Sequence, residues 1–243
     1  MKIFANTDVG KARNMNQDCY NVIQKEDLTL CILADGMGGY NGGDIASKLA
    51  TISAQNYILD NFYKIEDKSK KNILELIKNA TEYENMIVYD EANKTEELDQ
   101  MGTTLEICLI YNDRAYIGHI GDSRIYRIRK GLINKLTIDH SYVQKLVKDG
   151  TITREEAKNH PKKNMLIKAL GSTAFAEPDI TVRNFYKDDV ILICSDGLTN
   201  MVSEEEILKI IEEDLEKATI NLVNRANDLG GLDNITLIIV KND

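Results

Sequence analysis

The sequence predicts an α+β fold in which helices pack on the outside of antiparallel sheets. Two observations lead to this fold class. Several short segments rich in β-branched and aromatic residues follow one another so closely that no crossover helix fits between them, which indicates antiparallel pairing. Long segments with a helical spacing of apolar residues lie among these strands. The chain has 243 residues and no Pro/Ser-rich linker, so a single domain is expected over residues 1–243.

The first part of the chain is expected to contain three strands, at about 2–7, 19–24 and 28–34, followed by two helices. The predicted apolar face of the first helix consists of Ile45, Leu49, Ile52, Tyr57 and Leu59. That of the second helix consists of Ile73, Leu74, Ile77, Ala80 and Ile87. The acidic segment 89–100, YDEANKTEELDQ, is predicted to be an exposed loop.

The second part begins with three closely spaced strands, 103–111, 114–121 and 123–131, which are predicted to form antiparallel hairpins separated or closed by Asn112-Asp113 and Lys130-Gly131. Residues from about 140 to 160 have a polar helical pattern, in which Thr153 and Glu156 form a capping box. Strands are expected again at about 179–186 and 189–195. Two acidic amphipathic helices are expected within 203–228, and a final strand is expected at 233–240.

The composition excludes several classes of protein. The chain carries 30 basic and 39 acidic residues, a net charge of −9, which argues against a nucleic acid as the main partner. No segment approaches the roughly 18 uninterrupted apolar residues of a membrane-spanning helix, and the N-terminal segment has no signal-peptide run. A cytoplasmic protein without membrane insertion is therefore expected. The excess of acids either serves solubility or gathers around cations, and only the spacing of the acids can decide.

The four cysteines favour the same compartment. Cys19, Cys31, Cys108 and Cys194 are far apart and form no CxxC pair, which disfavours a zinc ribbon or a redox pair. Three of the four lie within apolar or β-branched runs and are interpreted as small core residues.

Aspartates recur where the predicted strands end. Asp35, Asp122, Asp196 and Asp233 lie in or beside glycine-containing turns, and Asp18 is a fifth. A single strand-end Asp is ordinary turn chemistry. Strand ends of a layered sheet gather at one edge, however, so these carboxylates can converge, and converged carboxylates repel one another unless cations compensate them. Magnesium and manganese prefer oxygen ligands, which suits an all-aspartate site.

Two other features belong to the same hypothesis. The glycine-rich segment 35–44 is either a flexible connector, a phosphate cradle without the Walker GK[ST] residues, or a segment that lets a main-chain carbonyl beside Asp35 reach a metal; the last interpretation fits best. Arg13 lies five residues before Asp18, and beside a metal–carboxylate cluster its guanidinium can bind two phosphate oxygens.

The motifs together identify a family. In order, they are TDVGKARNMNQD, LADGMGG, MGTTL, GHIGDSRIY, LTIDHS, NHPKKNMLIKALG, ICSDGL and GGLDNITLIIV. The chain resembles the metal-dependent protein phosphatases of type 2C in their compact bacterial form, from about residue 5 to residue 240. The resemblance implies a four-layer α-β-β-α sandwich, with two central antiparallel sheets flanked by helices and metals at one edge.

The resemblance also implies roles for individual residues. Asp35 bridges two metals, the Gly36 carbonyl binds the second, and Asp196 and Asp233 complete the first. Asp18 serves the second metal, either directly or through water. Asp122, with Asp196, matches a third-metal site of bacterial members, and Arg13 matches the phosphate-binding arginine.

The implied reaction is hydrolysis of phosphoserine and phosphothreonine at a centre of two, or with the third site three, Mn²⁺ or Mg²⁺ ions. Two metals roughly 3.5–4 Å apart share a water and lower its pKa. The resulting hydroxide attacks phosphorus in line with the leaving oxygen, while the metals and Arg13 offset charge on the equatorial oxygens. Two alternatives remain: a non-catalytic regulatory module of the same fold, or a metal-dependent hydrolase of another phosphomonoester.

The sequence departs from the family in the glycine loop. Tyr40 and Met37 stand where relatives carry a histidine, so the general acid stays unidentified, and Gln17 replaces the usual acid before Asp18. His119, near Asp122, is expected to pack or to form hydrogen bonds rather than to act as that acid. Residues about 140–170 match the family's flap, which either contacts substrate or is a solvated lid.

The resemblance also implies partners. These are phosphorylated protein substrates and a cognate Ser/Thr kinase, and the chain is expected to act as a monomer.

Overall fold

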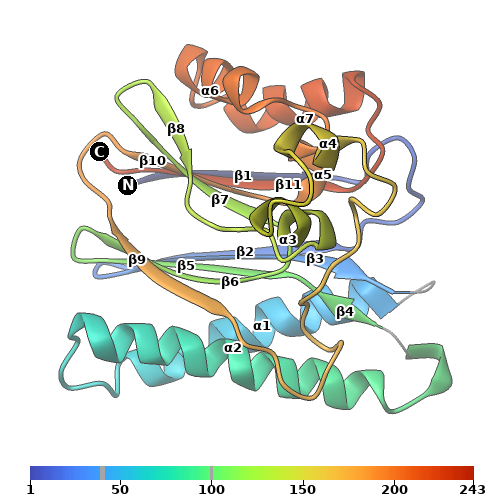
Figure 1. Cartoon of the computed structure of the whole chain (residues 1–243). Coiled ribbons are helices and arrows are strands. Elements are labelled where there is room, and N and C mark those ends of the chain that lie inside the picture. The colour runs from blue at the N-terminus through green and yellow to red at the C-terminus, as the bar shows by residue number, and fades with distance from the viewer. Residues whose placement is uncertain (39–41, 99–100) are drawn as a thin grey trace.

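The fold consists of four layers (Figure 1). The computed structural model describes residues 1–38, 42–98 and 101–243. Two antiparallel β-sheets face each other in the middle of the molecule, and helices cover both outer faces. This arrangement confirms the predicted α+β class and the α-β-β-α sandwich.

One sheet has five strands in the order β1, β11, β10, β7, β8. Their bounds are Lys2–Asp8, Ile235–Lys241, Val190–Cys194, Arg124–Arg129 and Leu132–Lys135. The second sheet follows the order β2, β3, β5, β6, β9, with the short β4 paired to β3. These strands cover Asp18–Gln24, Thr29–Met37, Leu105–Tyr111, Arg114–Ile120, Asp179–Asn184 and, for β4, Gly102–Thr103.

Tight turns connect two of the predicted hairpins. Asn112 and Asp113 have φ of 47° and 54° between β5 and β6, and Lys130 and Gly131 have φ of 52° and 72° between β7 and β8. Positive φ at both central positions matches the right-handed twist of the strands. The predicted hairpin between β6 and β7 is wrong. β6 pairs with β5 and β9, whereas β7 pairs with β10 and β8, so the chain passes from one sheet to the other within 121–123.

Two long helices cover the second sheet, α1 (Gly42–Phe62) and α2 (Lys70–Ala92). The predicted contact face of α1 is wrong at Ile52, which is 53% exposed. The residues buried against the sheet are small ones at four-residue spacing, followed by two large ones: Ala46, Ala50, Ala54, Ile58 and Phe62. Small side chains let the helix lie close to the strands, and a pattern based on large residues overlooks them.

In α2, Ile73, Ile77 and Ala80 are buried as predicted, together with Val88. This helix extends through Ala92 and a 3₁₀ turn covers Glu96–Leu98, so the prediction of a loop from residue 89 is wrong in its first part. Residues 99 and 100 lie outside the described part of the chain.

The first sheet is covered by α6 (Glu204–Glu213) and α7 (Ala218–Asp228), the two predicted acidic amphipathic helices. Smaller helices flank the sandwich: α3 (Tyr142–Lys148), α4 (Arg154–Lys158) and α5 (Asp196–Thr199). The capping box of Thr153 and Glu156 is confirmed. No helix among the described residues is both long enough and apolar enough to cross a membrane.

The core has one layer between the sheets and one under each helix pair. Cys31 and Cys108 are buried between the sheets, and Cys194 is buried under α6 and α7, all as free thiols, which confirms their interpretation as core residues. Burial raises the pKa of each of these thiols and therefore keeps it in the unreactive protonated form.

Candidate metal centre and active site

The five predicted aspartates lie at one edge of the sandwich. Asp18 opens β2 and is directly opposite Asp35 near the end of β3. Asp196 follows the end of β10, and Asp233 precedes the start of the antiparallel neighbour β11. Asp122 lies where the chain passes from β6 to β7. Residues that are up to 215 positions apart in the sequence therefore meet at the strand ends.

The aspartates interact electrostatically. Burial, and then the charges of Asp18, Asp196, Asp122 and Asp233, raise the pKa of Asp35 well above its ordinary value. Burial also raises the pKa of Asp18 to about 7, that of Asp122 to about 8 and that of Asp196 to about 6. Neighbouring aspartates add to each of these shifts, because uncompensated carboxylates cannot all be charged in one buried place.

Two of the aspartates are each held by a hydrogen bond from a neutral side chain. The Ser195 hydroxyl donates to Asp18 Oδ2 at 2.8 Å, and Asn200 Nδ2 donates to Asp196 Oδ2 at 2.9 Å. The second oxygen of Asp18, Oδ1, is buried and has no hydrogen-bond partner among the described residues. An acceptor left without a donor in this position is suited to a cation.

Arg13 contacts the same edge. Its Nη2 lies 2.8 Å from Asp233 Oδ2, and this hydrogen bond raises the pKa of the guanidinium further. The Arg13 side chain is 52% exposed, so its guanidinium group is accessible to a ligand from the solvent. The position agrees with a role in binding an anion beside the aspartates.

Asn234 is a residue of this edge that sequence reasoning missed. Its Oδ1 accepts from the Gln17 amide at 2.8 Å, and its Nδ2 donates to the carbonyls of Val9 and Met15 at 2.9 Å each. Asn234 thereby fixes the loop that carries Arg13. The available signal was its place directly after Asp233, where a side chain can reach the neighbouring loop.

Close backbone packing explains two glycines of the motifs. A Cβ on Gly36 would lie 2.0 Å from the Gly43 carbonyl oxygen, and one on Gly197 would lie 1.9 Å from the Asn234 carbonyl oxygen. Gly36 thus lets the first turn of α1 pack against the end of β3. The predicted loop position Tyr40 lies outside the described residues.

The donor set fits hard divalent cations by its chemistry, because it consists of carboxylate oxygens with an orphaned acceptor at Asp18. Within residues 1–38, 42–98 and 101–243, no group of three or more His, Cys, Asp or Glu side chains already has the arrangement to hold a metal ion. Two of the carboxylates point instead to the donors on Asn200 and Arg13.

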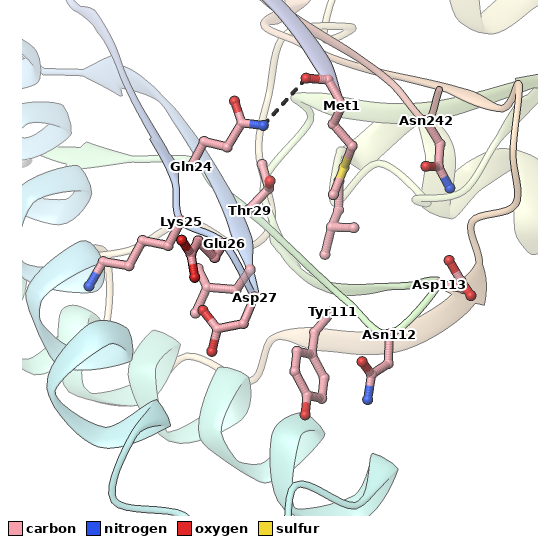
Figure 2. A pocket seen from close by; sticks show the side chains of 12 residues that line it. Met1, Gln24, Lys25, Glu26, Asp27, Thr29, Tyr111, Asn112, Asp113 and Asn242 are labelled. Atoms are coloured by element: carbon pink, nitrogen blue, oxygen red, sulfur yellow. Dashed lines mark hydrogen bonds between the residues drawn. The ribbon is translucent and has the colours of Figure 1, made fainter.

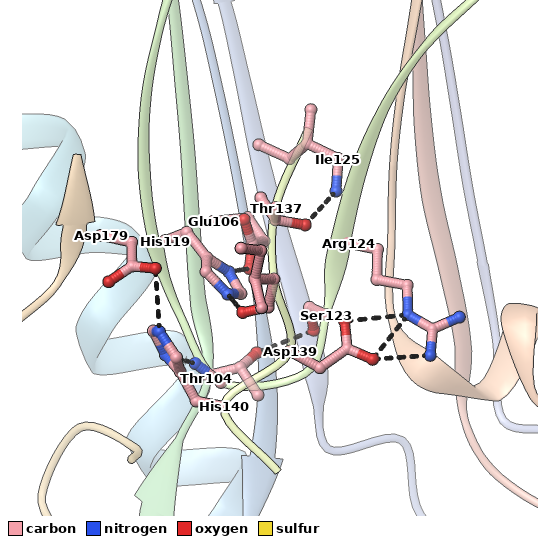
Figure 3. Close-up of polar contacts among 12 residues, drawn as sticks. Thr104, Glu106, His119, Ser123, Arg124, Ile125, Thr137, Asp139, His140 and Asp179 are labelled. Carbon is pink, nitrogen blue, oxygen red and sulfur yellow. Dashed lines mark hydrogen bonds and ion pairs between the residues drawn. The ribbon is translucent and has the colours of Figure 1, made fainter. Parts of the chain in front are cut away.

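The segment predicted to be a flap, residues about 140–170, follows β8 and lies beside this edge. It contains α3 and α4 and is joined at its base by a bridge between Ser141 and Leu166. Below it lies a group of buried polar residues (Figure 3). His119 Nδ1 is 2.5 Å from Glu106 Oε1 and its Nε2 is 2.8 Å from the Ile138 carbonyl oxygen, which agrees with the expected hydrogen-bonding role of His119.

The opposite end of the sandwich has a cleft of about 310 Å³ (Figure 2). It is lined by the end of β2, the start of β3 and the turn between β5 and β6, with Met1 and Asn242 at one side. Because Asp18 and Asp35 lie at the other ends of β2 and β3, this cleft is separate from the aspartate edge.

Comparisons with known proteins agree with the geometry. The family model described as Protein phosphatase 2C matches residues 10–230. The chain is 40% identical over 243 residues to protein phosphatase PhpP of Streptococcus pneumoniae, with 99% of this chain and 97% of the relative covered. It superposes on the S. agalactiae serine/threonine phosphatase with a TM-score of 0.90 and 36% identity, covering 100% and 99% of the two chains.

A third similar structure contains metal. It is the catalytic domain of the serine/threonine protein phosphatase PstP in complex with two manganese ions, at a TM-score of 0.83 and 33% identity, with 98% of this chain and 96% of that chain covered.

The fold and the acidic edge define a metal-dependent phosphoprotein phosphatase, a phosphoric monoester hydrolase that depends on Mn²⁺ or Mg²⁺. The chain belongs to the protein phosphatase 2C family. The family predicted from the sequence motifs is thus confirmed.

Proposed function

We propose that this chain, as one domain over residues 1–243, hydrolyses phosphoserine and phosphothreonine in proteins at the aspartate edge. The observation that carries the proposal is the electrostatic interaction of the five aspartates at one edge of the sandwich, beside an exposed arginine. Relatives of similar length are named as serine/threonine phosphatases, which supports this substrate class.

The proposed ligands at the aspartate edge hold a pair of cations and a third cation beside them. Asp35, Asp196 and Asp233 would hold the first cation, and Asp35 would also contribute to the second. The Gly36 carbonyl and Asp18, directly or through water, complete the second. Asp122, with Asp196, holds the third cation. The orphaned Oδ1 of Asp18 and the raised pKa values of Asp18, Asp122 and Asp196 support this assignment, since cations would supply the missing positive charge.

The bound cations supply a water of lowered pKa and positive charge for the phosphoryl oxygens. The residues of the chain provide the rest. Arg13 leaves Asp233 to bind two phosphate oxygens, and its fork orients the phosphoryl group. Asn234 keeps the Arg13 loop in place, and Ser195 orients Asp18. The contacts of Asn234 and Ser195 hold the Arg13 loop and Asp18 in place before substrate arrives, which reduces reorganisation during the reaction.

The wider setting follows from the substrate class. We propose that the phosphatase acts as a monomer in the cytoplasm and opposes a cognate Ser/Thr kinase. The flap, with its basic residues Lys158, Lys162, Lys163 and Lys168, is proposed to contact the phosphoprotein.

A metal titration tests the proposed function. Turnover of a phosphothreonine peptide should depend on added Mn²⁺ or Mg²⁺ and exceed turnover of a phosphotyrosine peptide and of a nucleotide. The matched control is Asp35→Asn, which preserves the size of the side chain. Equal preference for the nucleotide would indicate another phosphomonoester as substrate. No turnover of any of the three with metal present would indicate a regulatory module instead.

A further inference from the structure

The flap begins with His140, which forms two hydrogen bonds with the turn that carries Asp122. The His140 amide donates to the Gly121 carbonyl at 2.7 Å, and the Gly121 amide donates to His140 Nδ1 at 3.2 Å. One residue of the flap thus satisfies both backbone groups of the residue directly before Asp122. Gly121 has φ of 114°, a conformation that only glycine adopts easily, so this turn depends on external contacts to keep its shape.

The neighbouring residue, Asp139, binds the other end of the same turn through Arg124 (Figure 3). Asp139 accepts from Arg124 Nε at 3.1 Å and from Arg124 Nη2 at 2.7 Å, and Lys135 Nζ lies 3.0 Å from the same carboxylate. Two-point pairing of a guanidinium with a carboxylate fixes orientation as well as distance. Gly121 and Arg124 bracket Asp122, so Asp139 and His140 hold the Asp122 turn at both ends.

His140 also joins the two ends of the flap. Its carbonyl accepts from the Ile167 amide at 2.8 Å, and the Tyr142 amide donates to the Met165 carbonyl at 2.8 Å. On the far side of the ring, Nε2 is 3.3 Å from Asp179 Oδ2 at the start of β9. The outgoing chain, the returning chain and the Asp122 turn therefore meet at His140, through its backbone and its ring.

The hydrogen bonds determine the form of this imidazole. Nδ1 accepts from a backbone amide, so the ring proton is on Nε2, where it faces Asp179. Burial, and then the proximity of His119, lower the pKa of His140 to about 4, which agrees with a neutral ring. The rings of His119 and His140 stack with their centroids 4.5 Å apart. His119 is itself fixed by Glu106 and by the Ile138 carbonyl, so His140 rests on a rigid support.

We propose that His140 is a positioning residue, which couples the flap to the Asp122 turn and thereby sets the position of the Asp122 carboxylate at the aspartate edge. No group on His140 touches substrate in this proposal. The part that concerns cation binding rests on the proposed ligand role of Asp122, whereas the coupling of flap and turn stands on the hydrogen bonds alone.

Two substitutions separate the hydrogen bond from the bulk of the ring. His140→Phe keeps a ring that can stack on His119 but removes the acceptor for the Gly121 amide. His140→Asn keeps an acceptor, Oδ1, at about the position of Nδ1, and is the matched control. Three quantities are measured: hydrogen exchange of the Gly121 and Ile167 amides, Mn²⁺ binding by calorimetry, and kcat and KM on p-nitrophenyl phosphate.

In His140→Phe, the Gly121 and Ile167 amides are expected to exchange at least about tenfold faster. The weakest Mn²⁺ binding step should weaken by about tenfold, and kcat should fall by about tenfold with KM changed less than about twofold. In His140→Asn, each of these quantities should stay within about threefold of its value in the wild-type protein. A folded His140→Phe with unchanged exchange and unchanged Mn²⁺ binding would overturn the proposal.

The wild-type protein provides a further test of the coupling, without any substitution. If His140 couples the two regions, the amides of Gly121 and Ile167 should exchange with the same opening free energy. Rapid exchange at Ile167 with strong protection at Gly121 would refute the coupling. Lack of turnover with any metal would count against the proposed function and leave this exchange result standing.

Discussion

Glu84 provides the most direct test of the energetics of this fold. The residue is fully buried on α2, and neither carboxylate oxygen has a hydrogen-bond partner among the described residues. The nearby Ser53 hydroxyl, which would favour the charged form, donates to the Leu49 carbonyl. Burial raises the pKa of Glu84 to about 8 from an ordinary value of 4.5. Glu84→Gln removes this titration while preserving the shape of the side chain.

The sign and size of the effect follow from linkage. Because the pKa in the folded state is higher than 4.5, the folded chain binds the proton more tightly than the unfolded chain. The stability contributed by the protonated carboxyl is present in full below pH 4.5 and is lost as the pH rises through 8. The loss amounts to roughly 3 kcal/mol at pH 7 and approaches about 5 kcal/mol above pH 8.

The assay is thermal and urea unfolding of both proteins between pH 5.5 and pH 9. The stability advantage of Glu84→Gln should grow by about 3 kcal/mol over this range, a relative shift in Tm of about 6–12 °C. Glu82→Gln is the matched control on the same helix, because Glu82 is 46% exposed and pairs with Lys78 at 3.6 Å. The control should change stability by less than about 0.5 kcal/mol at any pH. An advantage of Glu84→Gln that does not vary with pH would refute the assignment of a buried, unpartnered carboxyl.

Substitutions at three further residues test the aspartate edge. Asp35→Asn should lower kcat on p-nitrophenyl phosphate by about a thousandfold with Mn²⁺ present, and raise Tm in EDTA at pH 8, because one of the mutually repelling carboxylates is neutralised; near-normal turnover would contradict its role. Arg13→Ala should raise KM by about tenfold with kcat changed less than about threefold, and Arg13→Lys should recover only part of the loss, because lysine lacks the fork; an unchanged KM would rule out phosphate binding. Gly36→Ala should lower the free energy of unfolding by about 3 kcal/mol or more in urea, since its Cβ would lie 2.0 Å from the Gly43 carbonyl oxygen; a neutral effect would show that the first turn of α1 can move away.

The sequence predicted the elements of the fold better than their partners. The turns at Asn112-Asp113 and Lys130-Gly131 were recognisable because their residue types tolerate positive φ. The passage from β6 to β7 has an equally short connection, yet its strands belong to different sheets. Local composition describes a strand, whereas the choice of sheet depends on contacts with segments far away in the sequence. In the same way, the burial of Ala46, Ala50 and Ala54 depends on the approach of α1 to the sheet.

The candidate site divides along the same line. The aspartates were predicted because charge at strand ends is visible in the sequence, and their mutual interactions in the structure agree with that prediction. The residues that hold them were not predicted. Asn234, Ser195 and His140 act through hydrogen bonds to groups far away in the sequence, and no spacing rule shows which group such a side chain will meet. The motif LTIDHS indicated that His140 belongs to the family pattern and left its contacts open.

The residues that keep the aspartates in place are needed because of the negative charge of the aspartates. Five carboxylates that lie close together repel one another, so an edge built only of loops would open further to water. In this fold neutral donors hold two of the carboxylates against this repulsion: the Ser195 hydroxyl on Asp18 and the Asn200 amide on Asp196. Among the described residues, the one positive group that forms an ion pair with these aspartates is Arg13, which is half exposed and can leave Asp233 for a phosphate. Neutral donors and a single exposed guanidinium leave much of the negative charge of the edge uncompensated, and in the proposed function this charge is what attracts divalent metals.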